Sequence, residues 1–192
     1  MLLFFAGERL WEVGRPEPVK LIVGILGADE ECLRFARERV EDEFGELDFV
    51  SEVWAFDQTR YYEDELGERP LRQFVSVGEL VDPGRLAGIK HAANDMEREL
   101  ADEVGGELGR PVNLDPGYLE PAKLVLASTK NFAHRIYIGE GMYAEITLGY
   151  RRGEWLGFEY SFPDYKGGRY HAFLSKVRAR LVEQLREMRR GG

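Results

Sequence analysis

The chain has 192 residues, of which 44% are hydrophobic, 12% aromatic and 32% charged, and its formal net charge at pH 7 is -9. This length and apolar content predict a folded domain with a sizeable core and exclude a disordered chain. The acid excess argues against an extended nucleic-acid surface, and no apolar run approaches the ~20 residues of a membrane span. A single cysteine, Cys32, excludes an internal disulfide framework and a cysteine-based zinc site. We therefore expect a compact cytoplasmic protein.

Residues 1–17 are predicted to form an N-terminal extension ahead of a single domain over residues 18–192. The first six residues are apolar, but they lack a basic region and Glu8 interrupts them too early for a signal peptide. Pro16 and Pro18 then indicate a short, stiff linker into the domain.

The order of strand and helix patterns predicts a ferredoxin-like core over residues 18–114. A buried strand over 19–26 precedes a helix over 29–44, which Gly45 ends. Strands over 48–56 and 71–77 follow, then a helix over 82–104 with Pro83 in its first turn, and a short strand over 110–114. This β-α-β-β-α-β order is that of a ferredoxin-like sandwich.

Residues 115–192 are predicted to add a helix, an antiparallel β-meander and a terminal helix. The segment 121–130 suits either a helix or a strand, and we favour a helix because Pro121 would occupy its first turn. Strands over 135–138, 143–150 and 154–162 form the meander, and a helix runs from 168 to 188. The predicted fold class is therefore α+β.

Polar residues gather in the segments 56–67, 113–118 and 128–135, with Tyr143 and Glu145 one turn further on. We expect the ends of the second and fourth strands to lie at the same sheet edge as the start of the first. Asp57, Asp115 and Lys20 would then share one rim, and loops at the rim of a rigid sheet are common functional sites. The residues predicted to bind a ligand there are Lys20, Asp57, Arg60, Asn113, Tyr118, Lys130, Asn131, Arg135 and Tyr143.

The chemistry predicted for this rim is anion binding with acid–base catalysis. His134 is the candidate general acid or base, and Asp115 the second candidate catalytic residue. Asp57, Asp115 and Glu145 are candidate Mg²⁺ ligands, since Mg²⁺ needs only one or two carboxylates besides a phosphate substrate. Structural alternatives stay open: Asp115 begins a good turn sequence, and Lys130 and Arg135 could simply pair with carboxylates.

Several common catalytic motifs are missing from the sequence. The segment 24–27 follows a strand and precedes a helix, as a phosphate-binding loop does, but it matches neither the P-loop nor the dinucleotide-binding glycine pattern. The sequence has no G-x-S-x-G nucleophile elbow and no H-E-x-x-H zinc motif. Known motifs therefore identify no reaction.

The same segments resemble an uncharacterised prokaryotic family catalogued as domain of unknown function four-four-one-six. The resemblance covers roughly residues 18–175, and its motif from Asn113 to Glu145 is long and specific. Gln58 and Leu66 depart from the Phe and Met usual in the family. The stretches that carry the resemblance are PVKL (18–21), FD (56–57) with Thr59 and YY (61–62), VNLDPGYL (112–119), LVLASTKN (124–131) with HRIY (134–137), YAE (143–145) and FPDY (162–165).

The resemblance implies no established activity. Some members carry an automatic label as GTP-binding proteins, but this sequence lacks the P-loop of a GTPase. Its TKNF segment (129–132) also has Phe132 where the guanine-reading motif requires Asp. Nucleotide binding in another mode stays open.

Two functions remain from the sequence. The first is binding, with or without catalysis, of a small phosphorylated molecule or nucleotide, with Mg²⁺ as a candidate cofactor. The second is a non-catalytic interaction module that binds a partner or a second copy of itself. The geometry of four residues separates them, because a ligand site requires Asp57, Asp115, His134 and Arg135 to face one pocket.

Overall fold

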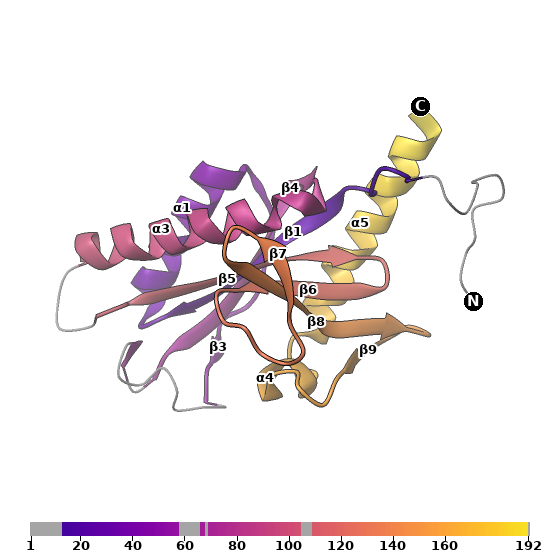
Figure 1. Ribbon diagram of the computed structural model, residues 1–192. Coiled ribbons are helices and arrows are strands. Elements are labelled where there is room, and N and C mark those ends of the chain that lie inside the picture. The colour runs from indigo at the N-terminus through magenta and orange to yellow at the C-terminus, as the bar shows by residue number, and fades with distance from the viewer. Residues whose placement is uncertain (1–12, 58–65, 68, 105–108, 192) are drawn as a thin grey trace.

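The computed structural model describes residues 13–57, 66–67, 69–104 and 109–191 (Figure 1). The elements in chain order are β1 (Val19–Gly27), α1 (Glu30–Phe44), β2 (Leu47–Val50), β3 (Trp54–Ala55), β4 (Leu71–Val81), the short 3₁₀ helix η1 (Pro83–Arg85), α3 (Leu86–Val104), β5 (Val112–Glu120), β6 (Lys123–Ser128), β7 (Ile136–Gly139), β8 (Met142–Arg151), β9 (Glu154–Gly157), α4 (Pro163–Lys166) and α5 (His171–Gly191).

One antiparallel sheet connects all the strands. Within the described residues it has nine strands in the order β2-β4-β1-β5-β6-β8-β7, with β3 paired to β4 and β9 paired to β8. Every strand pair is antiparallel. The α+β class is thus confirmed. The three strands predicted as a meander are present, but β7 and β9 pair with opposite ends of one edge of β8, whose other edge pairs with β6, and β9 ends at Gly157 rather than at 162.

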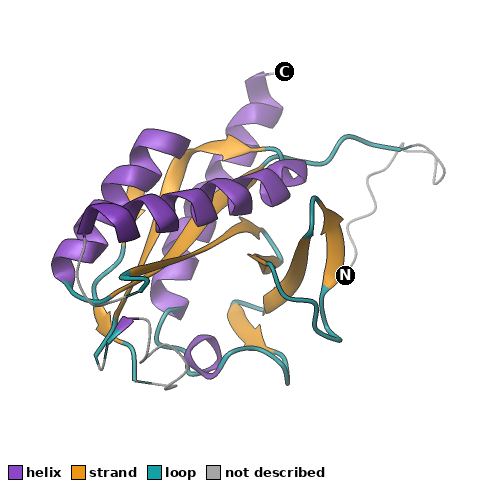
Figure 2. Ribbon diagram, turned by 60° about the vertical axis from the view of Figure 1, so that its left-hand side comes forward, coloured by secondary structure: helices purple, strands orange, loops and turns teal. Residues whose placement is uncertain are grey.

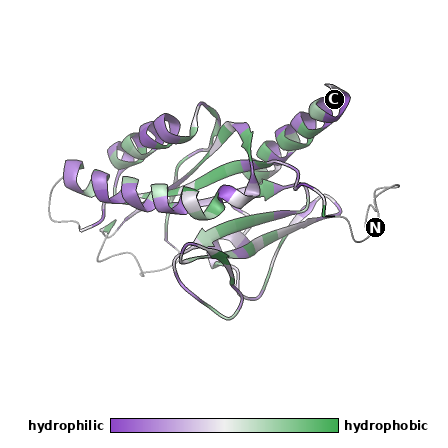
Figure 3. Ribbon diagram, turned by 45° about the horizontal axis from the view of Figure 1, so that its top comes forward, coloured by the Kyte–Doolittle hydropathy of each residue, from purple (hydrophilic) through white to green (hydrophobic). Residues whose placement is uncertain are grey.

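Helices cover both faces of the sheet, with α1 and α3 on one side and α5 on the other (Figure 2). Alternate residues of β1 face opposite sides, so Val23 and Ile25 pack against α1 and α3 while Ile22 packs against α5. One side of α5 is buried against the sheet and consists of Leu174, Val177, Leu181 and Leu185, which have the spacing of one helix face. Apolar residues accordingly concentrate on the central strands, and the outer faces of the helices are hydrophilic (Figure 3).

The segment predicted as a helix over 121–130 is the strand β6, so that prediction is wrong. Leu124 and Leu126 are buried on the α5 side, and Val125 and Ala127 are buried on the α3 side. A strand between two others, covered on both faces, is a continuous apolar run, which periodicity cannot distinguish from a buried helix. The predicted strand over 48–56 is also divided, into β2 and β3, which both pair with β4.

The predicted turn that follows the strand over 110–114 lies inside a longer strand, β5. Asp115 and Gly117 are opposite Gly24 and Ile22 of β1. Pro116 has no N–H to donate, and the pairing of β5 with β6 begins only at Gly117. Asp115 is therefore held on the rigid surface of the sheet, where β5 has separated from β6.

No helix in the described part of the chain is long and apolar enough to cross a membrane.

We expect Gly117→Ala to destabilise the fold strongly. A Cβ at position 117 would lie 2.2 Å from the Val125 carbonyl oxygen and 3.1 Å from the Leu126 Cα, and this neighbouring backbone cannot move without breaking the sheet. The loss in the free energy of unfolding should be about 3 kcal/mol, at the upper end of overpacking effects. Urea denaturation measures it.

The control for this substitution is Gly88→Ala, in α3, where a Cβ meets nothing within 4 Å. Alanine favours a helix by about 1 kcal/mol over glycine, so this variant should be at least as stable as the parent. Equal stability of Gly117→Ala and the parent protein would contradict the strand packing.

Candidate functional site

Two polar clusters occupy the sheet face that α5 only partly covers. The histidine cluster comprises Ser128, His134, Arg135, Glu145, Thr147 and Tyr160. The arginine cluster comprises Arg72, Asn113, Asp115, Asp164, Tyr165 and Tyr170. The register places both clusters on the same face, since Glu145 is opposite Leu126 and Asp115 is opposite Gly24.

Buried Glu145 is the centre of the histidine cluster. Its Oε2 accepts hydrogen bonds from Arg135 Nε at 2.7 Å and His134 Nε2 at 3.0 Å, and its Oε1 accepts one from Thr147 Oγ1 at 3.3 Å. A buried carboxylate is costly unless it is paired, and these three donors compensate it. Because a carboxylate only accepts, Nε2 carries a proton. Nδ1 can then accept from a hydroxyl group, including a protonated phosphate oxygen, or donate to an anion when the ring is doubly protonated.

Arg135 holds the loop between β6 and β7 in place. Its Nη1 donates to Ser128 Oγ at 2.6 Å and to the Lys130 carbonyl oxygen at 3.0 Å, and its guanidinium lies 4.6 Å from the centre of the Phe132 ring. This part of the side chain is structural, as the pairing alternative predicted. Its Nη2 is not fully buried and makes no hydrogen bond to the described residues.

A row of stacked rings borders the histidine cluster. His134 stacks on Tyr160 with ring centres 4.4 Å apart and planes at 10°, and Tyr160 stacks on Phe158 at 5.4 Å and 6°. Phe132 lies beyond His134, 6.0 Å away at 28°. The His134 side chain is 23% exposed, and the other three rings are exposed. Burial and the charge of Glu145 raise the pKa of Tyr160, which keeps its hydroxyl protonated.

Buried Arg72 is the centre of the arginine cluster. Its Nη1 lies 3.3 Å from Asp115 Oδ2, and its Nη2 lies 3.6 Å from Asp164 Oδ2. The Tyr170 hydroxyl donates to Asp164 Oδ2 at 3.2 Å. Gly24 leaves room for the guanidinium, because a Cβ there would lie 3.0 Å from Arg72 Nη1. The cluster thus joins β4, β5 and α4.

The two carboxyl groups that face Arg72 have pKa values shifted in opposite directions. Burial works against ionisation of Asp115, but the charges of Arg72 and Lys90 outweigh it and lower its pKa. Burial dominates at Asp164 and raises its pKa in spite of Arg72. Burial likewise raises the pKa of the neighbouring Tyr165 and Tyr170 hydroxyl groups. The environment of Arg72 therefore favours ionisation of Asp115 and opposes that of Asp164.

Lys20 does not share the rim with Asp57 and Asp115, and that prediction is wrong. The strands β2 and β1 both pair antiparallel with β4, so they run parallel and end at the same edge. Lys20 begins β1 and is opposite Leu119, whereas Asp115 is opposite Gly24. Along β1, Lys20 is therefore four residues, or roughly 13 Å, from the position opposite Asp115.

At its own end of the sheet Lys20 is a buried structural residue. Its ammonium pairs with Asp48 and donates to the Gly78 carbonyl oxygen at 2.9 Å and to Gln184 Oε1 at 3.0 Å. Burial lowers its pKa, and the charge of Asp48 works in the opposite direction. These bonds tie β1 to β4 and α5.

Other predicted ligand-binding residues are not members of either cluster, although Lys130 and Tyr143 border the histidine cluster, with Tyr143 opposite Ser128. Tyr118 is on the opposite face, where it packs with Val125 near α3. Asp57 is exposed and 3.4 Å from Arg169 Nη1. Tyr143 contacts the ring of Tyr137 at 5.5 Å. Lys130 and Asn131 are exposed on the loop before His134, and Arg60 lies outside the described residues.

The structure does not bring the predicted Mg²⁺ ligands together. Asp57, Asp115 and Glu145 each face a different cationic side chain, respectively that of Arg169, Arg72 and Arg135. No group of three or more His, Cys, Asp or Glu side chains among the described residues is arranged to hold a metal ion.

Sequence reasoning missed Arg72, Tyr160, Asp164 and Tyr165. Arg72 had a signal, because it is the charged residue of the predicted strand over 71–77. Asp164 and Tyr165 lie in the FPDY segment that carries the family resemblance. Tyr160 had none, since its role depends on stacking with a ring 26 positions earlier in the chain.

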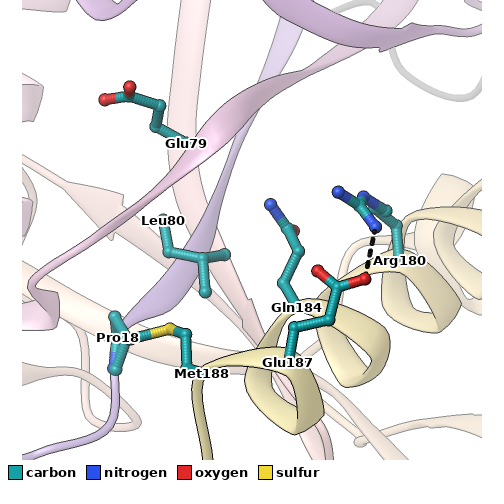
Figure 4. Close-up of a pocket in the computed structure, with 7 residues that line it drawn as sticks. All are labelled: Pro18, Glu79, Leu80, Arg180, Gln184, Glu187 and Met188. Atoms are coloured by element: carbon teal, nitrogen blue, oxygen red, sulfur yellow. Dashed lines mark ion pairs between the residues drawn. The ribbon is translucent and has the colours of Figure 1, made fainter. Parts of the chain in front are cut away.

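A surface groove of about 400 Å³ lies elsewhere, between β4 and the end of α5 (Figure 4). It is lined by Pro18, Glu79, Leu80, Arg180, Gln184, Glu187 and Met188. An ion pair of 3.7 Å between Arg180 and Glu187 neutralises charge on one side of it. None of the predicted ligand-binding residues lines this groove.

The comparisons with known proteins agree with the resemblance seen in the sequence. The model of a family described as "Domain of unknown function (DUF4416)" matches residues 17–181. No curated protein matches the chain. No solved structure matches it either.

We expect Asp115→Asn to lower stability in a pH-dependent way. The pKa of Asp115 lies below its ordinary value of 3.8, so its ionised form stabilises the fold at neutral pH, and this contribution is lost as the pH falls below that value. The substitution should cost about 1–2 kcal/mol of unfolding free energy near pH 7 and clearly less at about pH 3. Urea denaturation across this range measures it.

Asp164→Asn is the matched control, with the opposite sign. The pKa of Asp164 lies above 3.8, so its neutral form is favoured in the fold and its contribution falls as the pH rises through that pKa. This substitution should cost less near pH 7 than at about pH 3. The same pH trend in both variants would contradict the opposite pKa shifts of Asp115 and Asp164.

Proposed function

The chain belongs to that family of unknown function, and we propose from the geometry that it binds a small phosphorylated molecule, a sugar phosphate or nucleotide, at the histidine cluster. Asp57 pairs with Arg169, apart from Asp115, His134 and Arg135, so the four residues expected from the sequence do not face one pocket, and the proposal is confined to the histidine cluster. One observation carries the proposal. Buried Glu145 accepts hydrogen bonds from both His134 and Arg135, and the partly exposed imidazole of His134 stacks on Tyr160.

The charges of the histidine cluster favour an anion. Glu145 is the buried carboxylate, and its oxygens already accept three hydrogen bonds. Arg135 Nη2 and the exposed side chain of Lys130 supply positive charge at the same loop, and hydrogen bonds from such groups to phosphate oxygens are among the strong ones. These groups would meet a phosphate even though the chain as a whole has a net charge of -9.

The stacked rings favour a ligand that also has a planar ring. Phe132 and Phe158 stand at the two ends of the row that contains His134 and Tyr160. A nucleotide base stacks on such rings with a gain of about 1–3 kcal/mol each, whatever the base. This supports nucleotides alongside simple sugar phosphates.

The proposed chemistry of His134 is proton exchange with the bound molecule. A carboxylate that holds one ring nitrogen fixes the orientation and tautomer of the imidazole, as general acid–base histidines require. Mg²⁺ would arrive with the phosphate, since one carboxylate is a sufficient protein contribution to such a site. Asp115 is the candidate for that contact, because its side chain is 27% exposed.

We expect His134→Gln to weaken phosphate binding. The glutamine amide can still donate to Glu145, as His134 Nε2 does, but it lacks the second ring nitrogen. Loss of that contact should raise the Kd for inorganic phosphate and AMP about tenfold. Calorimetry with and without Mg²⁺ measures this Kd. In the parent protein, binding should also raise the thermal unfolding midpoint, because the ligand stabilises the folded state by mass action.

His91→Gln is the control, because His91 lies on α3 and its Nε2 contacts the Glu140 carbonyl oxygen at 2.8 Å, outside the cluster. This variant should bind like the parent. The proposal fails if the parent binds no phosphorylated molecule, or if His134→Gln binds as tightly as the parent.

We also propose that the first part of the domain is a ferredoxin-like core. The strand order β2-β4-β1-β5 supports this, with each neighbouring pair antiparallel. The helices α1 and α3, which follow β1 and η1, pack on the same face of these strands. A solved structure of this chain would test the assignment.

An interaction module is the second candidate function, and exposed apolar side chains of the meander favour it. Ile136 is opposite Ala144, and Ile146 is opposite Val125, so both face the α3 side. Leu156 follows Trp155, which is buried on the α5 side, and so it also faces the α3 side. All three are exposed, and contiguous exposed apolar groups mark interaction surfaces.

If this surface binds a second copy, Ile146→Asp should convert a dimer into a monomer. Sedimentation velocity measures the oligomeric state, and Glu154→Gln, at an exposed position of β9, is the control for surface charge. A parent protein that stays monomeric at about 100 µM, above the range of functional dimers, would contradict self-association.

A further inference from the structure

Three polar atoms in the arginine cluster are buried without a hydrogen-bond partner among the described residues. They are Arg72 Nε, Asn113 Nδ2 and the hydroxyl oxygen of Tyr165. The three residues are only 3%, 3% and 2% exposed. Leaving such a group unsatisfied costs about 1–3 kcal/mol, and native proteins leave few. Three in one cluster point to a bound molecule that supplies their partners.

The three groups surround one stretch of β1. A Cβ at Gly24 would lie 3.0 Å from Arg72 Nη1 and 3.3 Å from the Tyr165 hydroxyl, so both side chains extend over this glycine. Two residues further along β1, the register places Arg72 and Asn113 on either side of Leu26. The unsatisfied atoms therefore belong to one site above the strand.

The chemistry of this site suits hydroxyl groups. Arg72 Nε and Asn113 Nδ2 can only donate, the Tyr165 hydroxyl can donate or accept, and the partly exposed Asp115 carboxylate can only accept. A hydroxyl group of a ligand can accept a hydrogen bond from Arg72 or Asn113 and donate one to Asp115 at the same time. Asp115 and Asp164 already face Arg72, so the site offers no excess positive charge to a second anion.

The two clusters are close enough to serve one ligand. Gly117 of β5 is opposite Leu126 of β6, and two residues further on the same face are Asp115 and Ser128. Ser128 Oγ accepts a hydrogen bond from Arg135, within the histidine cluster. Paired strands lie about 4.8 Å apart, so the clusters adjoin where β5 and β6 separate.

We propose that the arginine cluster binds the hydroxyl groups of a sugar whose phosphate binds at the histidine cluster. The substrate class is then a phosphorylated sugar or a ribonucleotide, with the ring hydroxyls shared between Asp115, Asn113 and Tyr165. This inference rests on the proposed function, because the phosphate site places the ligand.

Tyr165→Phe tests the inference with one atom. The phenylalanine keeps the ring packing against Phe74 and Tyr170, at 5.8 Å and 5.5 Å, and removes only the hydroxyl oxygen. Calorimetry with ribose 5-phosphate and with inorganic phosphate separates the two clusters. We expect the parent protein to bind ribose 5-phosphate more tightly, and the variant to lose about tenfold for ribose 5-phosphate alone.

Two further variants keep the result interpretable. Tyr170→Phe removes a buried hydroxyl that is already bonded to Asp164, so it should not weaken ribose 5-phosphate selectively. Gly24→Ala places a methyl group 3.0 Å from Arg72 Nη1 and from the Phe74 ring and 3.3 Å from the Tyr165 hydroxyl, so it should weaken ribose 5-phosphate and leave inorganic phosphate unchanged. Urea denaturation measures how much stability the contact with the core ring of Phe74 costs. Circular dichroism confirms that each variant folds.

The outcomes separate the inference from the proposed function. If inorganic phosphate binds, and ribose 5-phosphate binds no tighter or is unaffected by Tyr165→Phe and Gly24→Ala, the hydroxyl site is overturned while phosphate binding stands. The three polar atoms would then be satisfied by water alone. If neither ligand binds the parent protein, the phosphate site and the hydroxyl site are both overturned.

Discussion

The ion pairs of buried Arg72 determine how the second half of the chain packs on the first. A guanidinium that loses its partner in the interior destabilises a protein by several kcal/mol, so Arg72 of β4 requires the carboxylates that β5 and α4 supply. Asp164 can reach it only if α4 lies against the sheet. Tyr165 and Tyr170 are then carried onto the ring of Phe74, and α5 begins from that point. The position of the terminal helix thus depends on a charge buried in the core.

Glu145 plays the same part for the loop between β6 and β7. Its carboxylate is buried on the sheet, and His134 and Arg135 fold back over it as donors. Much of the polar chemistry in both clusters is therefore structural, because it compensates charges that the strands bury. A few polar atoms of the two clusters take no part in this charge compensation. They are the second ring nitrogen of His134, the exposed edge of Asp115 and the unsatisfied donors beside Gly24, and these are the atoms that a ligand would meet.

The sequence predicts strands and helices reliably where one face of an element is polar, whereas an element buried on both faces is ambiguous. The apolar run of β1 was correctly predicted as a strand, but that of β6 was predicted as a helix because of Pro121. The helix α5 can be predicted because one of its sides faces solvent, which gives its apolar residues a helical spacing. The strand β6 is apolar on both sides, so the spacing of its apolar residues does not distinguish a strand from a helix. Asp115 and His134 were found because polar residues interrupted apolar runs. Tyr118 was grouped with Asp115 from its place in the same motif, yet an odd number of positions separates the two, so the strand puts them on opposite faces. Partners such as Tyr160 and Asp164 depend on tertiary contacts that local sequence does not contain.

A single short segment connects the two clusters, and this bears on how a ligand would be held. Tyr160, which stacks on His134, and Asp164, which faces Arg72, are four residues apart. Between them, Ser161 Oγ donates to the Thr147 carbonyl oxygen at 2.6 Å and accepts from the Phe158 amide at 2.8 Å, which fixes the segment to β8. Each end of the segment is thus anchored at a charge buried in the sheet. A molecule that contacts both clusters would meet side chains already ordered for structural reasons, so little conformational entropy is lost when it binds.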